Sequence, residues 1–417
     1  NPPPRSIGSR KMVIAPRAIF PPIMIIMIKD NGKLLSGIRV IELGQIAAGP
    51  FASSLLADLG ADVIKIENPK GGDGMRQWPP LNISQQKNNE AYSENFASVN
   101  RNKRSVALNI KDPSDVSLLK RLISKATILI ENYRPGVLNK LGLGYDDLKR
   151  INKKLIYCSI SGYGQSGPYS DKGAFDVTVQ AVAGIMSVTG EKDSSPVKCG
   201  VPIGDFCTGL YASYTIMAML RNVEKNGKGT HIDCSMLGSL LGISALQTSE
   251  YFGNRKAPEK LGSAHSRNAP YQAFQASDTF FVIAAGNDKL WGEVCEAVEM
   301  EHLKNDVRFT TQSDRAENQN QLSEILTKKF LKHDTKYWLK EMDKRKVPCA
   351  PINNFETILN DKHIKHMEIV KPITLPNGSK TYSVTFPVSI KGVETKDLKI
   401  PPKLGEHNEE IISEWLN

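Results

Sequence analysis

Short β-branched segments alternate with helical segments from Ile38 onward, and this alternation limits the possible folds more than any other feature of the sequence. Helical segments such as 51–59, which ends at Gly60, and 113–126 separate the candidate strands. Parallel strands require crossover connections of this kind, so the pattern predicts βαβ units and a doubly wound, Rossmann-like α/β domain. The candidate strands are 38–43, 62–67, 105–110, 127–132 and 154–161.

The turn after the first candidate strand, residues 44–49, reads GQIAAG. It has neither the GxGxxG spacing of dinucleotide-binding turns nor the Lys-Ser/Thr pair of a P-loop. The sequence therefore gives no signal for a dinucleotide or P-loop site.

The pattern of predicted strands, loops and helices changes beyond the apolar helical run at 206–221. We expect residues 34–225 to form the first part of a large α/β domain. Residues 226–342 are expected to form a smaller α/β domain with linkers, and 343–417 to return to the large domain. The segments that indicate the smaller domain are GKGTHIDCSM at 227–236, the loop GSAHSRNAPY at 262–271, a strand at 279–286 and polar helices up to about Met342.

Residues 1–33 contain five basic residues before their first acidic residue, Asp30. The apolar patch in this segment is far too short to span a bilayer. Such a leader is typical of a mitochondrial transit peptide, so we expect a mitochondrial matrix location, with cytoplasmic and peroxisomal locations left open. The net charge of the chain is +10. The basic residues before the first acid are Arg5, Arg10, Lys11, Arg17 and Lys29.

The rest of the chain is mildly basic, a property that suits a phosphate-bearing ligand or a solvated surface. No basic block with interleaved aromatic residues is present, so we expect neither nucleic-acid nor membrane binding. The six cysteines form no CxxC pair and no compact framework. This indicates buried thiols in a reducing compartment, and we expect no metal site.

One carboxylate, Asp205, lies between a glycine turn and an apolar run in the segment GVPIGDFCTG at 200–209. At a helix N-terminus, unpaired N–H groups and the helix dipole would keep this carboxylate ionised and able to act as a nucleophile. Aspartate is also a preferred helix N-cap, and the local sequence does not decide between the two roles.

Six segments in the same order together resemble the class III CoA-transferase family, which includes formyl-CoA:oxalate and carnitine CoA-transferases and α-methylacyl-CoA racemase. The resemblance implies the class III fold, with a doubly wound large domain, a smaller α/β domain and an interlocked homodimer. Motifs such as NIKDP, ISGYGQSGP, APYQAF and PINN are closest to members that use succinyl-CoA with glutarate or hydroxymethylglutarate. The six segments are 37–73, 100–113, 128–148, 155–176, 200–212 and 401–411.

The resemblance implies a mechanism without a permanently bound cofactor, in which coenzyme A thioesters and free dicarboxylic acids are the substrates. Asp205 would attack the acyl-CoA thioester to give a mixed anhydride, and the CoA thiolate would then form an aspartyl-CoA thioester. A carboxylate can exchange anhydride and thioester partners reversibly without a metal or a redox group.

The family's CoA contacts fall on eight positions of this chain, and four further positions are candidates for substrate contact. An arginine that stacks on adenine in the formyl-CoA enzyme is replaced by Asn68. In the loop 262–270, His265 and Arg267 could bind the distal carboxylate of a dicarboxylic acid, because arginine can pair with a carboxylate bidentately; an exposed surface loop is the alternative. The CoA positions are Ile46, Ala48, Leu108, Lys111, Asn132, Tyr133, Val137 and Lys140, and the substrate positions are Gln45, Asp176, His265 and Arg267.

Phe175 argues against a racemase, because the racemases of the family carry a histidine at this position and phenylalanine cannot carry a proton. The chain has no histidine before His231. Two alternatives to a succinyl-CoA-dependent transferase remain: a transferase for another acid such as oxalate, and a catalytically silent CoA-binding protein.

Overall fold

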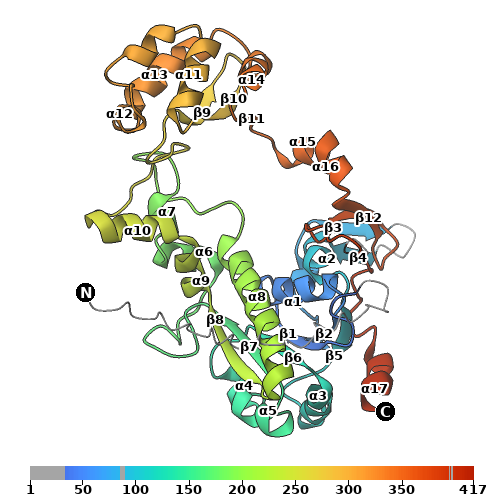
Figure 1. Ribbon diagram of the computed structural model, residues 1–417. Coiled ribbons are helices and arrows are strands. Elements are labelled where there is room, and N and C mark those ends of the chain that lie inside the picture. The colour runs from blue at the N-terminus through green and yellow to red at the C-terminus, as the bar shows by residue number, and fades with distance from the viewer. Residues whose placement is uncertain (1–32, 85–89, 394, 396–397) are drawn as a thin grey trace, which may run out of the picture.

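A parallel sheet of six strands lies in the lower lobe of the protein, as seen in the computed structural model (Figure 1) of residues 33–84, 90–393, 395 and 398–417. The strand order is β5-β2-β1-β6-β7-β8, and every adjacent pair is parallel. Counted along the chain within this sheet, the order is 3-2-1-4-5-6, the Rossmann arrangement. The strands are β1 (Arg39–Leu43), β2 (Asp62–Glu67), β5 (Arg104–Ala107), β6 (Ile128–Glu131), β7 (Ile156–Ser161) and β8 (Thr230–Ser235).

The five strands predicted from the sequence are confirmed, with ends that shift by a few residues. The segment 227–236, which we expected in the smaller domain, instead contains β8, which pairs with β7 along its length. It is an edge strand with largely polar residues, so it lacks the continuous apolar run that marked the other strands. The domain boundaries proposed above stay a prediction. The predicted leader lies, up to residue 32, outside the described residues.

Helices cover both faces of the large sheet, as expected for a doubly wound domain. On one face, α1 (Ala48–Asp58) packs against α8 (Ile203–Asn226), and both bury apolar residues against β1, β6 and β7. On the other face lie α3 (Pro113–Lys125), α5 (Tyr145–Ile151) and α17 (Asn408–Leu416). Trp415 of α17 donates from Nε1 to Asp62 at 3.0 Å, so the C-terminal segment is part of the large domain.

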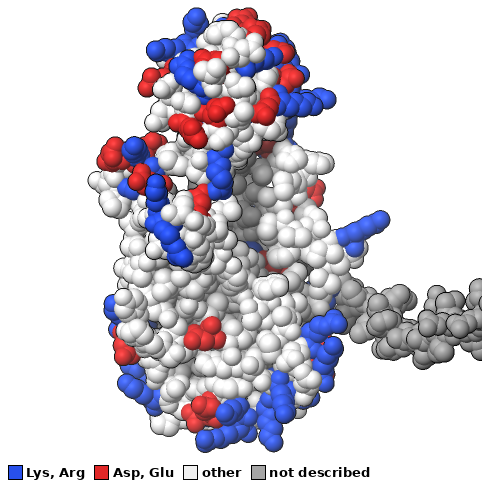
Figure 2. All heavy atoms as spheres, turned by 60° about the vertical axis from the view of Figure 1, so that its left-hand side comes forward, with Lys and Arg blue, Asp and Glu red and all other residues white. Residues whose placement is uncertain are grey.

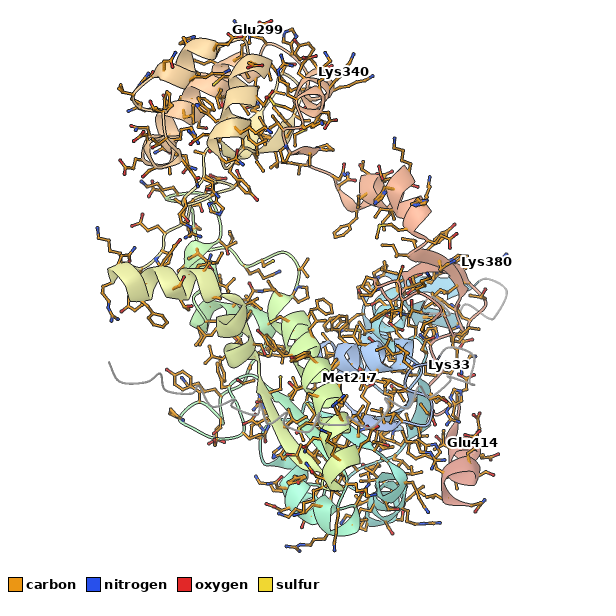
Figure 3. All side chains as sticks on the ribbon, in the orientation of Figure 1. Lys33, Met217, Glu299, Lys340, Lys380 and Glu414 are labelled. Atoms are coloured by element: carbon orange, nitrogen blue, oxygen red, sulfur yellow. The ribbon has the colours of Figure 1, made fainter. Side chains whose placement is uncertain are left out.

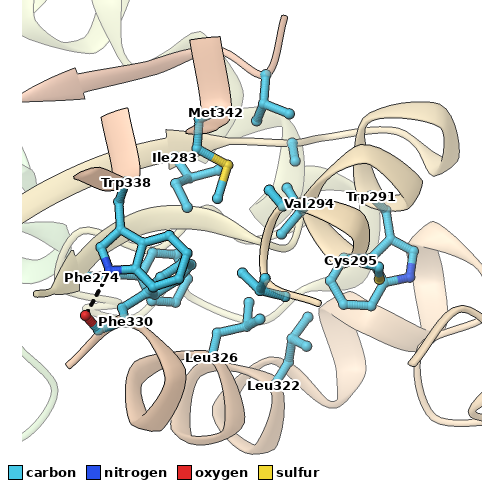
Figure 4. Packing of buried hydrophobic residues seen from close by; sticks show 14 of the residues in the cluster. Phe274, Ile283, Trp291, Val294, Cys295, Leu322, Leu326, Phe330, Trp338 and Met342 are labelled. Carbon is cyan, nitrogen blue, oxygen red and sulfur yellow. Dashed lines mark hydrogen bonds between the residues drawn. The ribbon is translucent and has the colours of Figure 1, made fainter. Parts of the chain in front are cut away.

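The upper lobe contains a three-stranded antiparallel sheet within the described residues, in the order β11-β10-β9. Its core is apolar and centres on Trp338, which is fully buried and donates from Nε1 to the Phe330 carbonyl oxygen at 2.7 Å (Figure 4). The elements are β9 (Tyr271–Gln275), β10 (Phe280–Ala284), α11 (Asp288–Ala297), η2 (Glu301–Asn305), α12 (Gln312–Glu317), α13 (Gln319–Phe330), α14 (Thr335–Lys344) and β11 (Cys349–Pro351).

Two separate connections join the lobes, so that the chain follows a ring (Figure 1). One connection passes through α10 (Ala245–Asn254) and the loop that follows it, and the other through α15 (Phe355–Leu359) and α16 (Lys362–Met367). Beyond α16 the chain forms the hairpin β12 (Val370–Thr374) and β13 (Lys380–Val384) beside the large sheet domain. Near this hairpin lie η1 (Gly74–Gln77), β3 (Leu81–Ser84), β4 (Glu90–Ser93) and α2 (Glu94–Asn100).

None of the helices in the described part of the chain has the length and apolar character required to cross a membrane.

A buried network of charged side chains links the first two strands of the large sheet. Lys65 on β2 lies 2.7 Å from Glu42 on β1 and 2.9 Å from Asp73, while Lys103 lies 2.8 Å from the other oxygen of Glu42. All four side chains are fully buried. Burial raises the pKa of Glu42, but the ammonium groups of Lys103 and Lys65 outweigh this effect and lower the pKa to about 2. The network is therefore charged at neutral pH.

We predict that Lys65→Met destabilises the protein by about 3–5 kcal/mol, because it leaves Glu42 and Asp73 buried without their shared cation. Urea unfolding followed by far-UV circular dichroism gives this difference. The control is Lys149→Met, which removes an exposed ion pair with Asp146 and should change stability by less than about 1 kcal/mol. Equal losses in the free energy of unfolding for the two substitutions would contradict the proposed contribution of the network to stability.

Candidate functional site

The turn after β1 holds a residue in a strained conformation. Ile46 has a φ of +65°, which is rare for a β-branched residue. Its N–H donates to both carboxylate oxygens of Asp73 at 3.1 Å, and Asp73 is itself held by Lys65. The buried network thus fixes the turn, since such a conformation persists only where its surroundings determine it.

Asn132, which follows β6, ties this turn to the neighbouring strand. Its Oδ1 accepts from the Gln45 N–H and its Nδ2 donates to the Gln45 carbonyl oxygen, both at 2.8 Å. The strands β1 and β6 are adjacent and parallel, so their C-terminal ends lie at the same edge of the sheet. Ligands bind at this edge in open α/β sheets.

A cavity of about 400 Å³ opens at this edge. It brings together seven of the predicted catalytic, CoA-binding and substrate residues: Gln45, Ile46, Ala48, Asn132, Tyr133, Asp176 and Asp205. The other lining residues are Ala47, Arg134, Ile160, Ser161, Gly162, Ala174, Phe175 and Met236. The predicted nucleophile therefore shares one cavity with residues from the C-terminal ends of three strands.

Asp205 is the third residue of α8 and does not cap it. The helix begins at Ile203 after Pro202, which makes no side-chain capping bond. Within the described residues the Asp205 carboxylate has no hydrogen-bond partner, although it lies in the first helical turn and is only partly exposed. The alternative of a simple N-cap is thus wrong, and the carboxylate is left free to react.

Asp176, the first residue of α6 (Asp176–Val182), caps the first turn of α8 instead. Its Oδ1 accepts from the Gly204 N–H in the first turn of α8 at 2.7 Å, and its Oδ2 accepts from Gln180 Nε2 at 2.6 Å. Gln180 is fully buried, and its Oε1 accepts from the Cys199 N–H at 2.9 Å. A side chain at Gly204 would place Cβ 2.8 Å from Asp176 Oδ1, so glycine is needed for this approach.

The pKa of Asp205 is raised from its ordinary value to about 6, by burial first and by the neighbouring charge of Asp176 second. The sequence predicts that the helix N-terminus keeps this carboxylate ionised at neutral pH. Above pH 7 the ionised form still prevails. A carboxylate with a raised pKa is a stronger nucleophile, because nucleophilicity rises with basicity.

The remaining predicted CoA positions do not line this cavity. Leu108 is buried in the core on the α3 face of the sheet, so only its backbone is available to a ligand. Lys111 is exposed beyond β5, and Val137 and Lys140 form the ends of the short helix α4 (Val137–Lys140) beyond β6. Asn68 is exposed after β2, where its Oδ1 accepts from the Lys70 N–H at 2.8 Å. All of these residues follow C-terminal ends of strands in the large sheet.

The structure does not bring His265 and Arg267 to the cavity. The Arg267 guanidinium forms an ion pair with Glu250 on α10, and Ser266 Oγ donates to the same carboxylate at 3.1 Å. The His265 ring packs against Tyr271, with ring centres 5.1 Å apart. Their expected role in binding a distal carboxylate is therefore not supported, because the loop satisfies their charge and packing locally.

Two residues of the site were missed in the sequence. Gln180 follows Asp176 by four positions, and this helical spacing was a signal that could have revealed the pair. Arg134 lies within the segment ENYRPG, but nothing in the local sequence shows that it borders the cavity.

We predict that the free energy of unfolding of Asp205→Asn exceeds that of the wild type by an amount that grows from about pH 4 to pH 7. The folded pKa of about 6 lies above the ordinary 3.8, so the wild type loses stability as pH rises through this window, by about 3 kcal/mol. Urea titrations at several pH values measure the difference.

The control for this experiment is Asp146→Asn, because Lys149 lowers the pKa of Asp146. The wild type should gain stability over this variant as pH rises, which is the opposite sign. A difference between wild type and Asp205→Asn that does not vary with pH would contradict the raised pKa.

Comparisons with known proteins agree over nearly the whole chain. The sequence model of CoA-transferase family III matches residues 35–408. The succinyl-CoA:glutarate CoA-transferase of Mus musculus is 38% identical over 388 residues, which cover 93% of this chain and 87% of the mouse protein. The acetyl-CoA:oxalate CoA-transferase of Acetobacter aceti is 39% identical over 317 residues, which cover 76% of this chain and 80% of that protein.

Among solved structures, a CaiB/BaiF family protein from Brucella suis has the same fold. It matches with a TM-score of 0.81 at 36% identity, covering 92% of this chain and 100% of the Brucella chain.

Proposed function

The chain belongs to CoA-transferase family III, and we propose that it transfers CoA from succinyl-CoA to a dicarboxylic acid such as glutarate, with Asp205 as the nucleophile. The chain is an enzyme, as the family and the CoA-transferases that it resembles indicate, so a catalytically silent CoA-binding protein is set aside. One observation supports the role of Asp205 above the others. A carboxylate that has no hydrogen-bond partner among the described residues, and whose pKa is raised to about 6, faces a cavity at the ligand-binding edge of the sheet.

The first half-reaction begins with attack of an Asp205 oxygen on the thioester carbonyl carbon of succinyl-CoA. The C–S bond breaks and CoA leaves as a thiolate, which gives a succinyl–aspartyl anhydride. The thiolate then attacks the side-chain carbonyl carbon of Asp205. The anhydride C–O bond breaks, succinate leaves with the electron pair, and an aspartyl-CoA thioester remains.

The second half-reaction repeats these steps with the acceptor. A glutarate carboxylate attacks the aspartyl-CoA thioester, which gives a glutaryl–aspartyl anhydride and the thiolate. The thiolate attacks the glutaryl carbonyl carbon, glutaryl-CoA forms, and Asp205 leaves as a free carboxylate. No proton and no electron is gained or lost overall, so the proposed cycle uses only substrates and Asp205.

Neighbouring residues support this chemistry by position. Asp176 accepts a hydrogen bond from the Gly204 N–H in the first turn of α8. Burial is the larger cause of the raised Asp205 pKa, and the charge of Asp176 is the second. The Gln45 side chain lines the cavity and can donate to an oxyanion, which forms at each attack. We propose that Ile46, Ala48, Asn132 and Tyr133 contact the CoA thioester end.

The rest of CoA would follow the C-terminal edge of the sheet. Lys111 and Lys140 are exposed and positively charged, and they can meet its phosphates. Leu108 and Val137 lie beside them along the chain and would contribute backbone and apolar contacts.

Phe175 favours transfer over racemisation. It lies at the N-cap of α6, lines the Asp205 cavity and is 77% exposed, but it cannot carry a proton. A transferase that accepts oxalate is the second candidate, because the Acetobacter relative that carries this name is 39% identical. The two differ only in the acceptor acid.

We also propose that two chains interlock as a homodimer. The chain follows a ring, and with the side chains drawn the view in Figure 3 remains open between the lobe that carries Glu299 and Lys340 and the lobe that carries Met217. Large apolar side chains are exposed on α8 and α10, among them Tyr214, Leu246 and Phe252 at 76%, 59% and 65%. Figure 2 shows the charges of one face gathered at its upper and lower ends, with few between them.

For location, we propose the mitochondrial matrix. The support is the basic leader described above, which has no acid before Asp30, together with the similarity to a mammalian succinyl-CoA:glutarate CoA-transferase.

We predict that the wild type converts succinyl-CoA and glutarate to succinate and glutaryl-CoA, and that Asp205→Ala lowers the rate by about 10³-fold or more, because it removes the nucleophile. Mass spectrometry of the CoA thioesters measures both products. Oxalate in place of glutarate tests the second candidate. Comparable rates for wild type and Asp205→Ala would contradict the assigned nucleophile.

The dimer is tested by sedimentation velocity over a dilution series and in mild denaturant. We predict a species of twice the chain mass throughout, which disappears only together with the native circular dichroism signal, because threaded rings cannot separate while folded. Release of folded monomers would contradict the interlocking.

A further inference from the structure

Arg134 is the only cationic side chain among the described residues that line the Asp205 cavity. The same lining contains the carboxylates of Asp176 and Asp205. A dicarboxylate substrate carries two negative charges, and repulsion from two fixed carboxylates would disfavour its binding. The cavity therefore needs a cation where the substrate's second carboxylate lies, and Arg134 is placed to supply it.

The Arg134 guanidinium has no ion pair and no hydrogen bond within the described part of the chain. Three arginines that are buried or largely buried differ in this respect. Arg76 pairs with Glu67, Arg101 with Asp58, and Arg315 with Asp288. Arg134 thus presents its full set of donors to whatever enters the cavity.

The residue that faces Arg134 is a glycine. A Cβ at Gly173 would lie 3.2 Å from Arg134 Nη2, a closer approach than most Cβ atoms make. The absence of a side chain at this position leaves room for the guanidinium beside the cavity.

Arg134 also lines a second cavity of about 320 Å³, which is largely polar. Gln165 Nε2 lines the same cavity, and it is buried without a hydrogen-bond partner among the described residues. A buried amide donor without a partner is costly, and an acceptor from a ligand would satisfy it. Two unpartnered donors, Arg134 and Gln165, therefore belong to one cavity.

The acidic residues of the second cavity oppose an anion less than their number suggests. Asp146 pairs with Lys149. Glu131 accepts from the Tyr133 N–H at 2.8 Å, and burial raises its pKa to about 7, so it is partly protonated at neutral pH. Asp171 is exposed to solvent. The end of the cavity at Arg134 keeps its positive charge.

We propose that Arg134, assisted by Gln165, binds the free distal carboxylate of the dicarboxylic acyl group while the other end reacts at Asp205. This inference rests on the proposed function and names what selects its substrate class. The acyl chain would extend from the Asp205 cavity into the second cavity, and the guanidinium would pair with the carboxylate bidentately. Arg134 thereby takes the role that the sequence had suggested for Arg267.

Kinetics with glutarate and valerate test the proposal, because both acids have five carbons and only glutarate has a distal carboxylate. With saturating succinyl-CoA, Arg134→Gln should lower kcat/KM for glutarate by about 100-fold and change that for valerate by less than about threefold. The Arg134→Lys variant keeps the charge without the planar fork, and it should fall between Arg134→Gln and the wild type for glutarate.

The matched control is Arg121→Gln, which removes an exposed arginine on α3 away from both cavities and should leave both kcat/KM values unchanged. Melting temperatures of all variants should agree with the wild type within about 2 °C, because Arg134 is exposed and has no ion pair among the residues that the structure describes.

Equal losses for glutarate and valerate would overturn the proposal, since they would place Arg134 on the CoA moiety or in the fold of the turn. No loss for either acid would overturn it as well. Failure of the wild type to transfer CoA from succinyl-CoA to any dicarboxylic acid would refute the proposed function itself. That failure is visible before any substitution is made, so the two cases are distinguishable.

Discussion

The buried ionic network of Glu42, Lys65, Asp73 and Lys103 is the interaction on which the site depends. It joins β1 to β2, reaches the residue just before β5, and places the Asp73 carboxylate under the Ile46 N–H. Charges are removed from water at high cost, and a network is favourable only where its members satisfy one another. Here Lys65 and Lys103 each pair with a carboxylate. Because Asp73 is fixed in this way, it also fixes the strained turn at Ile46 that borders the Asp205 cavity.

The reactivity of Asp205 comes from a division of roles between two carboxylates on different helices. Asp176 accepts a hydrogen bond from the first turn of α8, whereas Asp205 has no hydrogen-bond partner in the described part of the chain. The charge of Asp176 adds to burial in raising the Asp205 pKa. Gln180 fixes Asp176 by bonding it to the loop at Cys199. The geometry of the nucleophile is therefore set by packing between α6 and α8 rather than by its own contacts.

The sequence predicts the features that depend on local pattern, and it fails where tertiary contacts decide. The five apolar strands were found because their β-branched runs are buried on both faces, whereas the polar edge strand β8 was assigned to the other domain. Asp205 was found through its glycine-flanked position and the family resemblance. The ion pair of Arg267 with Glu250 could not be predicted because Glu250 lies on a separate helix, and the position of Arg134 beside the cavity follows only from the folded sheet.

The return of the chain to the large domain has a consequence for its biosynthesis. The helix α17 packs on the sheet, where Trp415 bonds to Asp62 and the Asn408 side chain accepts from the Ala107 N–H. The large domain therefore cannot complete its core as it leaves the ribosome, because the upper lobe must be synthesised before α17 appears. During translation the β2–β5 edge of the sheet therefore stays uncovered until α17 has been synthesised.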